Sequence, residues 1–347
     1  MESRIYVGTE AGIVTLQSSD GRSWNPESEA LQSWEVSTVA VDPGNPNRVL
    51  AGTRGDGVWL SEDCGVQWRK PSYGKPGPGK VRSLAIDRKN PRRVYAGCEP
   101  IDLFVSEDFG STWERLPSIW DVPYVATVTY PVATVEPHVR DIAIDPDDSN
   151  ILYAALQVGY LLKSTDGGRN WTLLNKDLDC DVHTIVIDPS NPSRITVATG
   201  GGDSRKGNVK GRALYASADG GASWGPAAME FAQEYSVPLV ASPTDPKVMF
   251  SALAHGNPNQ WRKNERGADS LLIRSQDGGA SWKSVGQGAG VLGRQYPEAI
   301  VIDRVDPNHV YAGFRSGDFI ASADGGTTWS EVDVKTPSVT SARIADF

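Results

Sequence analysis

Imidazole, guanidinium and carboxylate side chains stand beside several short apolar runs of this sequence. Arg82, Arg140, His183 and Glu298 each lie at the start of such a run, and Asp141 directly follows Arg140. Imidazole and carboxylate groups can transfer protons in general acid–base catalysis, and the arginine fork binds anionic groups. We therefore take His183, Glu298, Arg140, Arg82 and Asp141 as the candidate catalytic residues.

Histidine is rare in this chain, with four in 347 residues. His138, His183 and His255 stand at the ends of predicted strands, whereas His309 lies in a polar turn. Because neutral imidazoles are common ligands of divalent metals, one hypothesis is that these three histidines hold one divalent metal, with Glu298 or Asp141 beside them. The alternative is that these polar groups only line a water-filled opening.

The elements that position these residues come from a repeat. Seven copies of the motif Ser-x-Asp-x-Gly-x-x-Trp occur, the first of them shortened by one residue, at 18–24, 61–68, 106–113, 164–171, 217–224, 275–282 and 322–329. The Asp carboxylate can accept backbone N–H bonds within a tight turn, Gly supplies a positive φ, and Trp can cover the turn. Each copy is therefore predicted to be a structural hairpin turn, named here a repeat turn.

A second pattern precedes six of the repeat turns: an apolar run ending in Asp or Ser, a polar turn, and a second apolar run. The six copies begin at Val39, Leu84, Ile142, Ile185, Leu239 and Ile300. The seventh copy is divided, because 339–347 can supply only its first strand and the N-terminal residues from Arg4 only its second. Both ends of the chain are therefore predicted to share one blade and to close a ring.

These patterns predict an all-β fold. The repeat turns are roughly 50 residues apart, which suits one four-stranded blade per repeat. The expected architecture is a seven-bladed β-propeller of four-stranded blades, forming a single domain over 1–347, with the ring closed by pairing of the C-terminal strand with the N-terminal blade.

The repeat motif resembles the Asp-box, or BNR repeat, over essentially the whole chain. Propellers with this repeat include sialidases, xyloglucanases, sortilin-type receptors and the photosystem II assembly factor. The resemblance implies the fold and a structural role for the repeat turns, on the face opposite the binding site, but it leaves function open. The sialidase Arg-Ile-Pro signature is missing, because Arg4-Ile5 is followed by Tyr6, and xyloglucanases resemble two such propellers in tandem.

In such a propeller, the loops that enter the first strands and leave the second strands gather at one mouth of the central channel. Four of these loops are long (117–137, 200–212, 255–270 and 286–297), whereas the opposite face has short turns. The residues that enter the first strands should form one ring: Ser37, Arg82, Arg140, His183, Val237, Glu298 and Ser341. Those that end the second strands should form another: Glu10, Arg54, Glu99, Gln157, Gly200, His255 and Arg315. We expect the functional site at this mouth.

Composition narrows the class of protein. The net charge of −9 speaks against a nucleic-acid partner, and no apolar stretch is long enough to span a membrane. Three cysteines do not make a disulfide framework or a zinc motif. We expect a cytoplasmic monomer.

Two functions fit these features. The first is a hydrolase- or lyase-type enzyme, glycosidase-like by resemblance, with a His/Arg/carboxylate site and a small anionic or carbohydrate-like substrate. The alternative is a non-enzymatic propeller that binds a protein or acts as an assembly factor. Long loops and clustered histidines favour the enzyme, and the absence of known catalytic signatures favours the binding protein.

Overall fold

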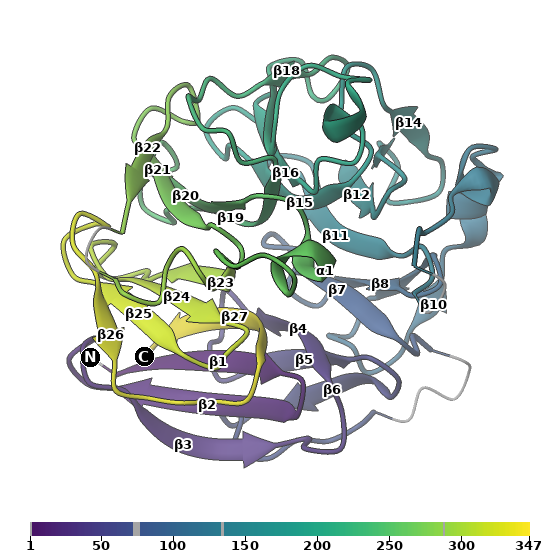
Figure 1. The fold of residues 1–347 in the computed structure, drawn as a ribbon. Helices are drawn as coiled ribbons and strands as arrows, with labels where there is room; N and C mark the ends of the chain where they lie inside the picture. Colours follow the sequence, from purple (N-terminus) through teal and green to yellow (C-terminus); the bar gives the residue numbers. More distant parts are fainter. Residues whose placement is uncertain (1, 72–76, 133–134, 287–288) are drawn as a thin grey trace.

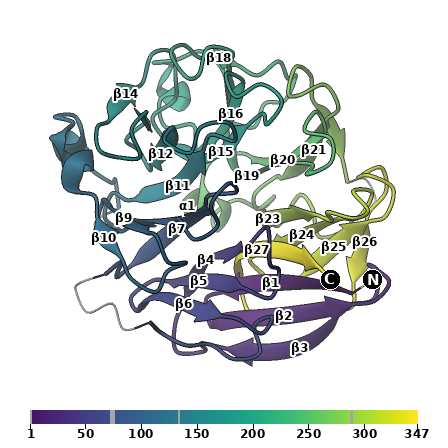
Figure 2. The same ribbon diagram turned by 180° about the vertical axis from the view of Figure 1, so that it is seen from behind.

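Seven small antiparallel sheets surround a central axis in the computed structural model (Figures 1 and 2). The structure describes residues 2–71, 77–132, 135–286 and 289–347. The first strand of each sheet contacts the first strands of both neighbouring sheets, so the sheets close into a ring. The fold is the predicted seven-bladed β-propeller.

The strands fall into four positions from the channel outward. The inner strands are β4 (Val36–Val41), β7 (Val81–Ile86), β11 (Val139–Ile144), β15 (Val182–Ile187), β19 (Tyr235–Ala241), β23 (Pro297–Ile302) and β27 (Val339–Asp346). The second strands are β1 (Ser3–Thr9), β5 (Val49–Thr53), β8 (Val94–Cys98), β12 (Leu152–Leu156), β16 (Ile195–Thr199), β20 (Met249–Ala254) and β24 (Val310–Phe314). The third strands are β2 (Gly12–Ser18), β6 (Gly57–Ser61), β9 (Asp102–Ser106), β13 (Leu161–Ser164), β17 (Leu214–Ser217), β21 (Leu271–Ser275) and β25 (Phe319–Ser322). The outer strands are β3 (Asn25–Ala30), β10 (Glu114–Arg115), β14 (Thr172–Leu174), β18 (Gly225–Pro226), β22 (Lys283–Val285) and β26 (Ser330–Val332).

One blade has fewer described strands than the other six. Within the described residues the sheet β4-β5-β6 has three strands, and an isolated bridge between Leu60 and Arg69 stands where the fourth strand is expected. The backbones of these two residues exchange both hydrogen bonds, at 2.9 Å each. Pro71 lacks an N–H group, so the ladder cannot continue regularly through it.

Burial explains why the second strands are the most apolar. In six of the seven every residue is buried, and in β1 all but Arg4 are, because each sheet is covered on both faces by neighbouring blades. The outer strands have no neighbour on one edge and are exposed or half-buried. The core therefore lies between blades.

The short helices lie in the long loops of one face. They are η1 (Pro117–Asp121), η2 (Val125–Thr127), η3 (Ser204–Lys206) and α1 (Pro258–Trp261). Figure 1 shows α1 close to the ring axis. Among the described residues no helix is long and apolar enough to cross a membrane.

Each repeat turn is held by its own serine and aspartate. In the copy that begins at Ser275, the buried serine hydroxyl donates to Asp277 Oδ1 at 2.8 Å and accepts the Gly279 N–H at 2.9 Å. Asp277 also accepts the Ser281 N–H at 2.8 Å. The turns also bond to the turns that follow the inner strands, as in the 2.9 Å bond from Gly278 N–H to Lys247 O. The repeat turns are therefore structural, on the face opposite the long loops.

We expect Ser275→Ala to lower the free energy of unfolding by about 1–3 kcal/mol, because the Gly279 N–H then stays buried without an acceptor. Chemical denaturation measures this change. Ser281→Ala is the matched control, since its exposed hydroxyl donates to Asp277 Oδ2 at the rim of the same turn and its loss should cost much less. Equal losses for both variants would contradict the role assigned to the buried serine.

We also expect the fold to lose stability in acid. Hydrogen bonds from the side chain and backbone amide of Asn170 lower the pKa of Asp166 to about 2. Bonds led by Ser223 and Thr328 lower the pKa values of Asp219 and Asp324 to about 2 as well.

Because these folded-state pKa values lie below the unfolded value of about 3.9, their stabilisation is present above that pH and is lost as the pH falls toward 2. The melting temperature should therefore fall between about pH 4 and pH 2. A triple variant with Asn at Asp166, Asp219 and Asp324 should melt lower at pH 7 and show a shallower fall. An identical slope in both proteins would contradict this expectation.

Candidate functional site

A β-bulge near the channel mouth occurs in every inner strand. In β11, Val139 pairs with Leu156 and Asp141 with Ala155, which leaves Arg140 unpaired. A bulge inserts one residue and redirects its side chain. The unpaired residues are Ser37, Arg82, Arg140, His183 and Glu298, together with Val237 and Pro238 in β19 and Thr340 in β27.

The bulges confirm the first predicted ring, with one correction. All of the bulged residues line the central channel, whose volume is about 660 Å³. In β27 the bulged residue is Thr340, one residue before the expected Ser341, which pairs with Gly8 and also lines the channel. The second predicted ring also holds: its seven residues each directly follow a second strand.

Arg82 lies in a compact charged cluster. It contacts Glu99 at 3.5 Å, and Arg54 contacts the same Glu99 oxygen at 3.3 Å and Glu35 at 3.3 Å. Burial, with the charges of Arg140 and Arg54, lowers the pKa of Arg82 to about 9. Its Nε is buried and has no partner among the described residues.

His138 joins this cluster as a neutral imidazole. Its Nδ1 lies 2.9 Å from Glu136 O, to which it donates, and 4.0 Å from Glu99. Burial, followed by the charge of Arg82, lowers the pKa of His138 to about 2. Nε2 is therefore an acceptor, and it is buried without a partner in the described part of the chain.

Arg140 is a charged residue of the mouth whose guanidinium group has no bonding partner in the described part of the chain. Within the described residues its side chain makes no hydrogen bond and no ion pair, although it is half-buried. Its charge acts on Arg82 and His138, lowering the pKa of each. Three arginines therefore face two carboxylates in this sector, and one guanidinium fork remains free for an anion.

His183 is held between two blades. Its Nδ1 lies 2.7 Å from Ser236 O, and its Nε2 lies 3.3 Å from Asp181 Oδ1. Burial acts to raise the pKa of Asp181, but the charge and hydrogen bond of His183 outweigh it and lower that pKa. Both ring nitrogens of His183 therefore face oxygen atoms of the protein, and the ring joins the strand of one blade to that of the next.

Asp141 and Glu298 differ in environment. Asp141 accepts the N–H groups of Ile142 at 2.9 Å and of Ile185 at 2.8 Å, which ties β11 to β15. Burial nevertheless raises the pKa of Asp141 to about 6. Glu298 instead forms an ion pair with Arg315 at 2.7 Å. The mouth thus holds one carboxyl group suited to carry a proton near neutral pH and one carboxylate that is paired.

The three histidines proposed to hold a metal contact three different carboxylates. His138 lies near Glu99 and His183 near Asp181, while His255 contacts Glu234 at 3.3 Å and is 41% exposed. The part of the chain that the structure describes has no group of three or more His, Cys, Asp or Glu side chains placed to hold a metal ion. The described residues therefore offer no matching ligand set for the predicted divalent metal.

An aromatic cluster beside His183 was not foreseen from the sequence. The Tyr235 ring lies 5.2 Å from His183, 5.3 Å from Trp261 and 5.6 Å from Tyr296, and the Trp261 and Tyr296 rings are 4.9 Å apart. Trp261 comes from the loop that carries α1, and its Nε1 donates to His255 O. Tyr235 is the first residue of β19, and Tyr296 directly precedes β23. Because both residues lie where an inner strand begins, the sequence could have placed them near the channel mouth.

Comparison with known proteins places the chain among propellers. No protein-family model matches it. A xyloglucanase from Paenibacillus sp. is 33% identical over 99 residues, which are 27% of this chain and 9% of that protein. The match thus spans less than a tenth of that relative's length.

Solved structures extend the likeness over most of the chain. An ancestral GH74 enzyme has a TM-score of 0.63 at 20% identity and covers 85% of this chain, which spans 38% of that protein. The Niastella koreensis GH74 enzyme has a TM-score of 0.59 at 14% identity, with 97% and 65% covered. YCF48 bound to a D1 peptide has a TM-score of 0.53 at 16% identity, with 83% and 79% covered. At these identities the likeness shows the fold: a seven-bladed propeller whose structural neighbours include glycoside hydrolases and YCF48.

Proposed function

We propose that the channel mouth binds a carboxylate-bearing sugar and that the protein acts on it as a hydrolase or lyase. The observation that carries this proposal is Arg140, a half-buried guanidinium without a partner among the described residues, beside the charged cluster of Arg82. A free arginine fork in a partly desolvated opening favours a carboxylate, which it can bind through two parallel hydrogen bonds.

The neighbouring groups suit the rest of an acidic sugar. Thr340 and Glu298 line the same opening and carry oxygens that can accept hydrogen bonds from sugar hydroxyls. A neutral sugar would leave the half-buried charge of Arg140 without a counter-charge. Selectivity for an acidic over a neutral oligosaccharide follows.

Asp141 supports the catalytic part of the proposal. With a pKa of about 6 it can hold a proton for a leaving oxygen near neutral pH, as a general acid requires. Glu298, which its ion pair with Arg315 holds in place, is the second carboxylate and would accept a proton from water or from a sugar carbon through its other oxygen. Arg140 and Arg82 then hold the substrate and neutralise its carboxylate.

The proposal is tested by measuring how the wild-type protein binds two oligosaccharides, one acidic and one neutral. Calorimetry should show binding of oligogalacturonate that weakens as salt rises, and little binding of neutral xyloglucan oligosaccharides. New reducing ends without ultraviolet absorbance would identify a hydrolase, and absorbance of a new carbon–carbon double bond a lyase. Equal binding of both sugars, or binding of neither, would contradict the proposal.

A second candidate is a protein-binding propeller, which one observation favours. YCF48, whose structure was solved with a bound D1 peptide, has the same fold and matches 83% of this chain at 16% identity. On this alternative Arg140 would bind an acidic side chain or a peptide carboxylate. Binding of acidic peptides in the same calorimeter, without any effect of oligogalacturonate, would favour this function over the enzyme.

A further inference from the structure

Arg343 is the exception in a ring of small apolar residues inside the channel. It stands three residues after the bulge of its inner strand. The same position in the other six inner strands holds Ala40, Ala85, Ala143, Val186, Val240 and Val301. Three strand residues span about 10 Å, so Arg343 lies about that far below the mouth.

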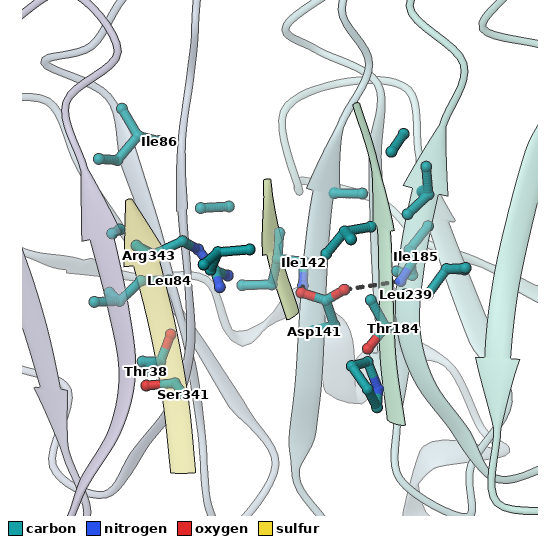
Figure 3. A pocket seen from close by; sticks show the side chains of 18 of the residues that line it. Thr38, Leu84, Ile86, Asp141, Ile142, Thr184, Ile185, Leu239, Ser341 and Arg343 are labelled. Carbon is teal, nitrogen blue, oxygen red and sulfur yellow. Dashed lines mark hydrogen bonds between the residues drawn. The ribbon is translucent and has the colours of Figure 1, made fainter. Parts of the chain in front are cut away.

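The surroundings of Arg343 offer it little compensation. Its only hydrogen bond in the described structure goes from Nη1 to the carbonyl of its neighbour Ala342, at 2.8 Å. The side chain extends into the channel (Figure 3) and stays accessible to solvent there. Enclosure by the inner strands lowers the pKa of Arg343, and the charge of Asp141 opposes this. Arg343 is thus a solvent-accessible cation whose remaining donors bond to no protein group in the described structure, and such a group can bind an anion.

The channel wall at the level of Arg343 is apolar. Ala85, Ala143, Val186 and Val240 are half-buried there and line the channel, whereas charged and hydroxyl side chains line it nearer its two ends. Within the described part of the chain, Asp141 is the acidic group whose charge acts on Arg343, and no ion pair joins the two side chains. Its two oxygens accept backbone N–H groups and keep further lone pairs free.

We propose that Arg343 and Asp141 form a second binding site, inside the channel, for a short aliphatic carboxylate that carries an amino or hydroxyl group next to its carboxylate. Arg343 binds the carboxylate, Asp141 accepts the hydrogen bond of the amino or hydroxyl group, and the aliphatic wall contacts the hydrocarbon chain. The site shares Asp141 with the function proposed above but requires no reaction. Its test measures binding alone.

The test uses the full chain and three probes of similar size: leucine, 2-hydroxyisocaproate and isocaproate. Calorimetry should show binding of leucine or 2-hydroxyisocaproate and weaker binding of isocaproate, which lacks the donor. Arg343→Ala should weaken binding at least about tenfold, since it removes a charge-assisted hydrogen bond. This variant introduces the residue that Ala40, Ala85 and Ala143 already provide in other blades, so we expect it to fold.

Arg88→Ala is the matched control. Arg88 lines the same channel near its opposite end, so this variant removes one positive charge and leaves Arg343 in place. Binding should persist in it. Asp141→Asn should weaken binding of leucine more than that of isocaproate. The proposal is overturned if the wild-type protein binds none of the probes, or if Arg343→Ala binds them as the wild type does.

Discussion

Deletion of residues 339–347 is expected to destroy cooperative folding of the propeller. These residues form β27, which pairs with β1 from Asp346 opposite Ser3 to Val339 opposite Thr9. Val339, Ala342 and Ile344 belong to the apolar core between neighbouring blades. Their loss and the exposed edge of β1 should cost more than about 5 kcal/mol, which is comparable to the whole stability of many domains.

Urea and thermal unfolding, followed by circular dichroism, measure the effect of this deletion. Removal of Phe347 alone is the control, because that residue is 36% exposed and lies beyond the end of β27. We expect the control to unfold like the full chain. If a protein lacking residues 339–347 also melts like the full chain, the pairing of β27 with β1 does not contribute to the stability of the propeller.

Arg140→Ala is expected to weaken binding of an acidic oligosaccharide by about 30-fold or more, without lowering the melting temperature. The large effect follows because Arg140 has no partner within the described residues, so its full hydrogen-bonding capacity is available to the ligand. One charge-assisted bidentate contact of about 2–3 kcal/mol corresponds to such a factor. Arg140→Lys should restore part of the affinity, because the charge returns without the fork.

Arg22→Ala is the control for net charge, since Arg22 is exposed in a repeat turn on the opposite face. Titration calorimetry of the three variants at one salt concentration compares them directly. Affinity that changes equally in Arg140→Ala and Arg22→Ala would show that overall charge, rather than the mouth, governs binding. A preserved affinity in Arg140→Ala would remove the central observation behind the proposed function.

The repeat turns show that much of this fold is determined by residues close together in the sequence. Ser275, Asp277 and Gly279 close their turn within five residues, through hydrogen bonds that the motif itself specifies. Because seven such turns recur at blade-length spacing, the number of blades could be read from the sequence. The divided strand pattern at the two ends likewise predicted the pairing of β27 with β1, since each half lacked the partner that the other supplies.

The contacts of individual side chains at the mouth could not be predicted from the sequence. His138, His183 and His255 come from different blades, so no spacing along the chain fixes their separation, and each meets a different carboxylate. The shift from Ser341 to Thr340 has a similar cause. Which residue of an inner strand bulges depends on its pairing with a second strand, and a slip of one residue changes the side chain that faces the channel.

The sequence alone thus determined the propeller, the ring closure and the face on which the charged rings lie, because turn chemistry and strand periodicity act over a few residues. Only the tertiary structure decided that Arg140 is unpaired among the described residues, that His183 bridges two blades and that Arg343 stands in a ring of Ala and Val. These properties depend on which atoms of distant segments meet across the channel. That is a matter of packing between blades, which no single repeat encodes.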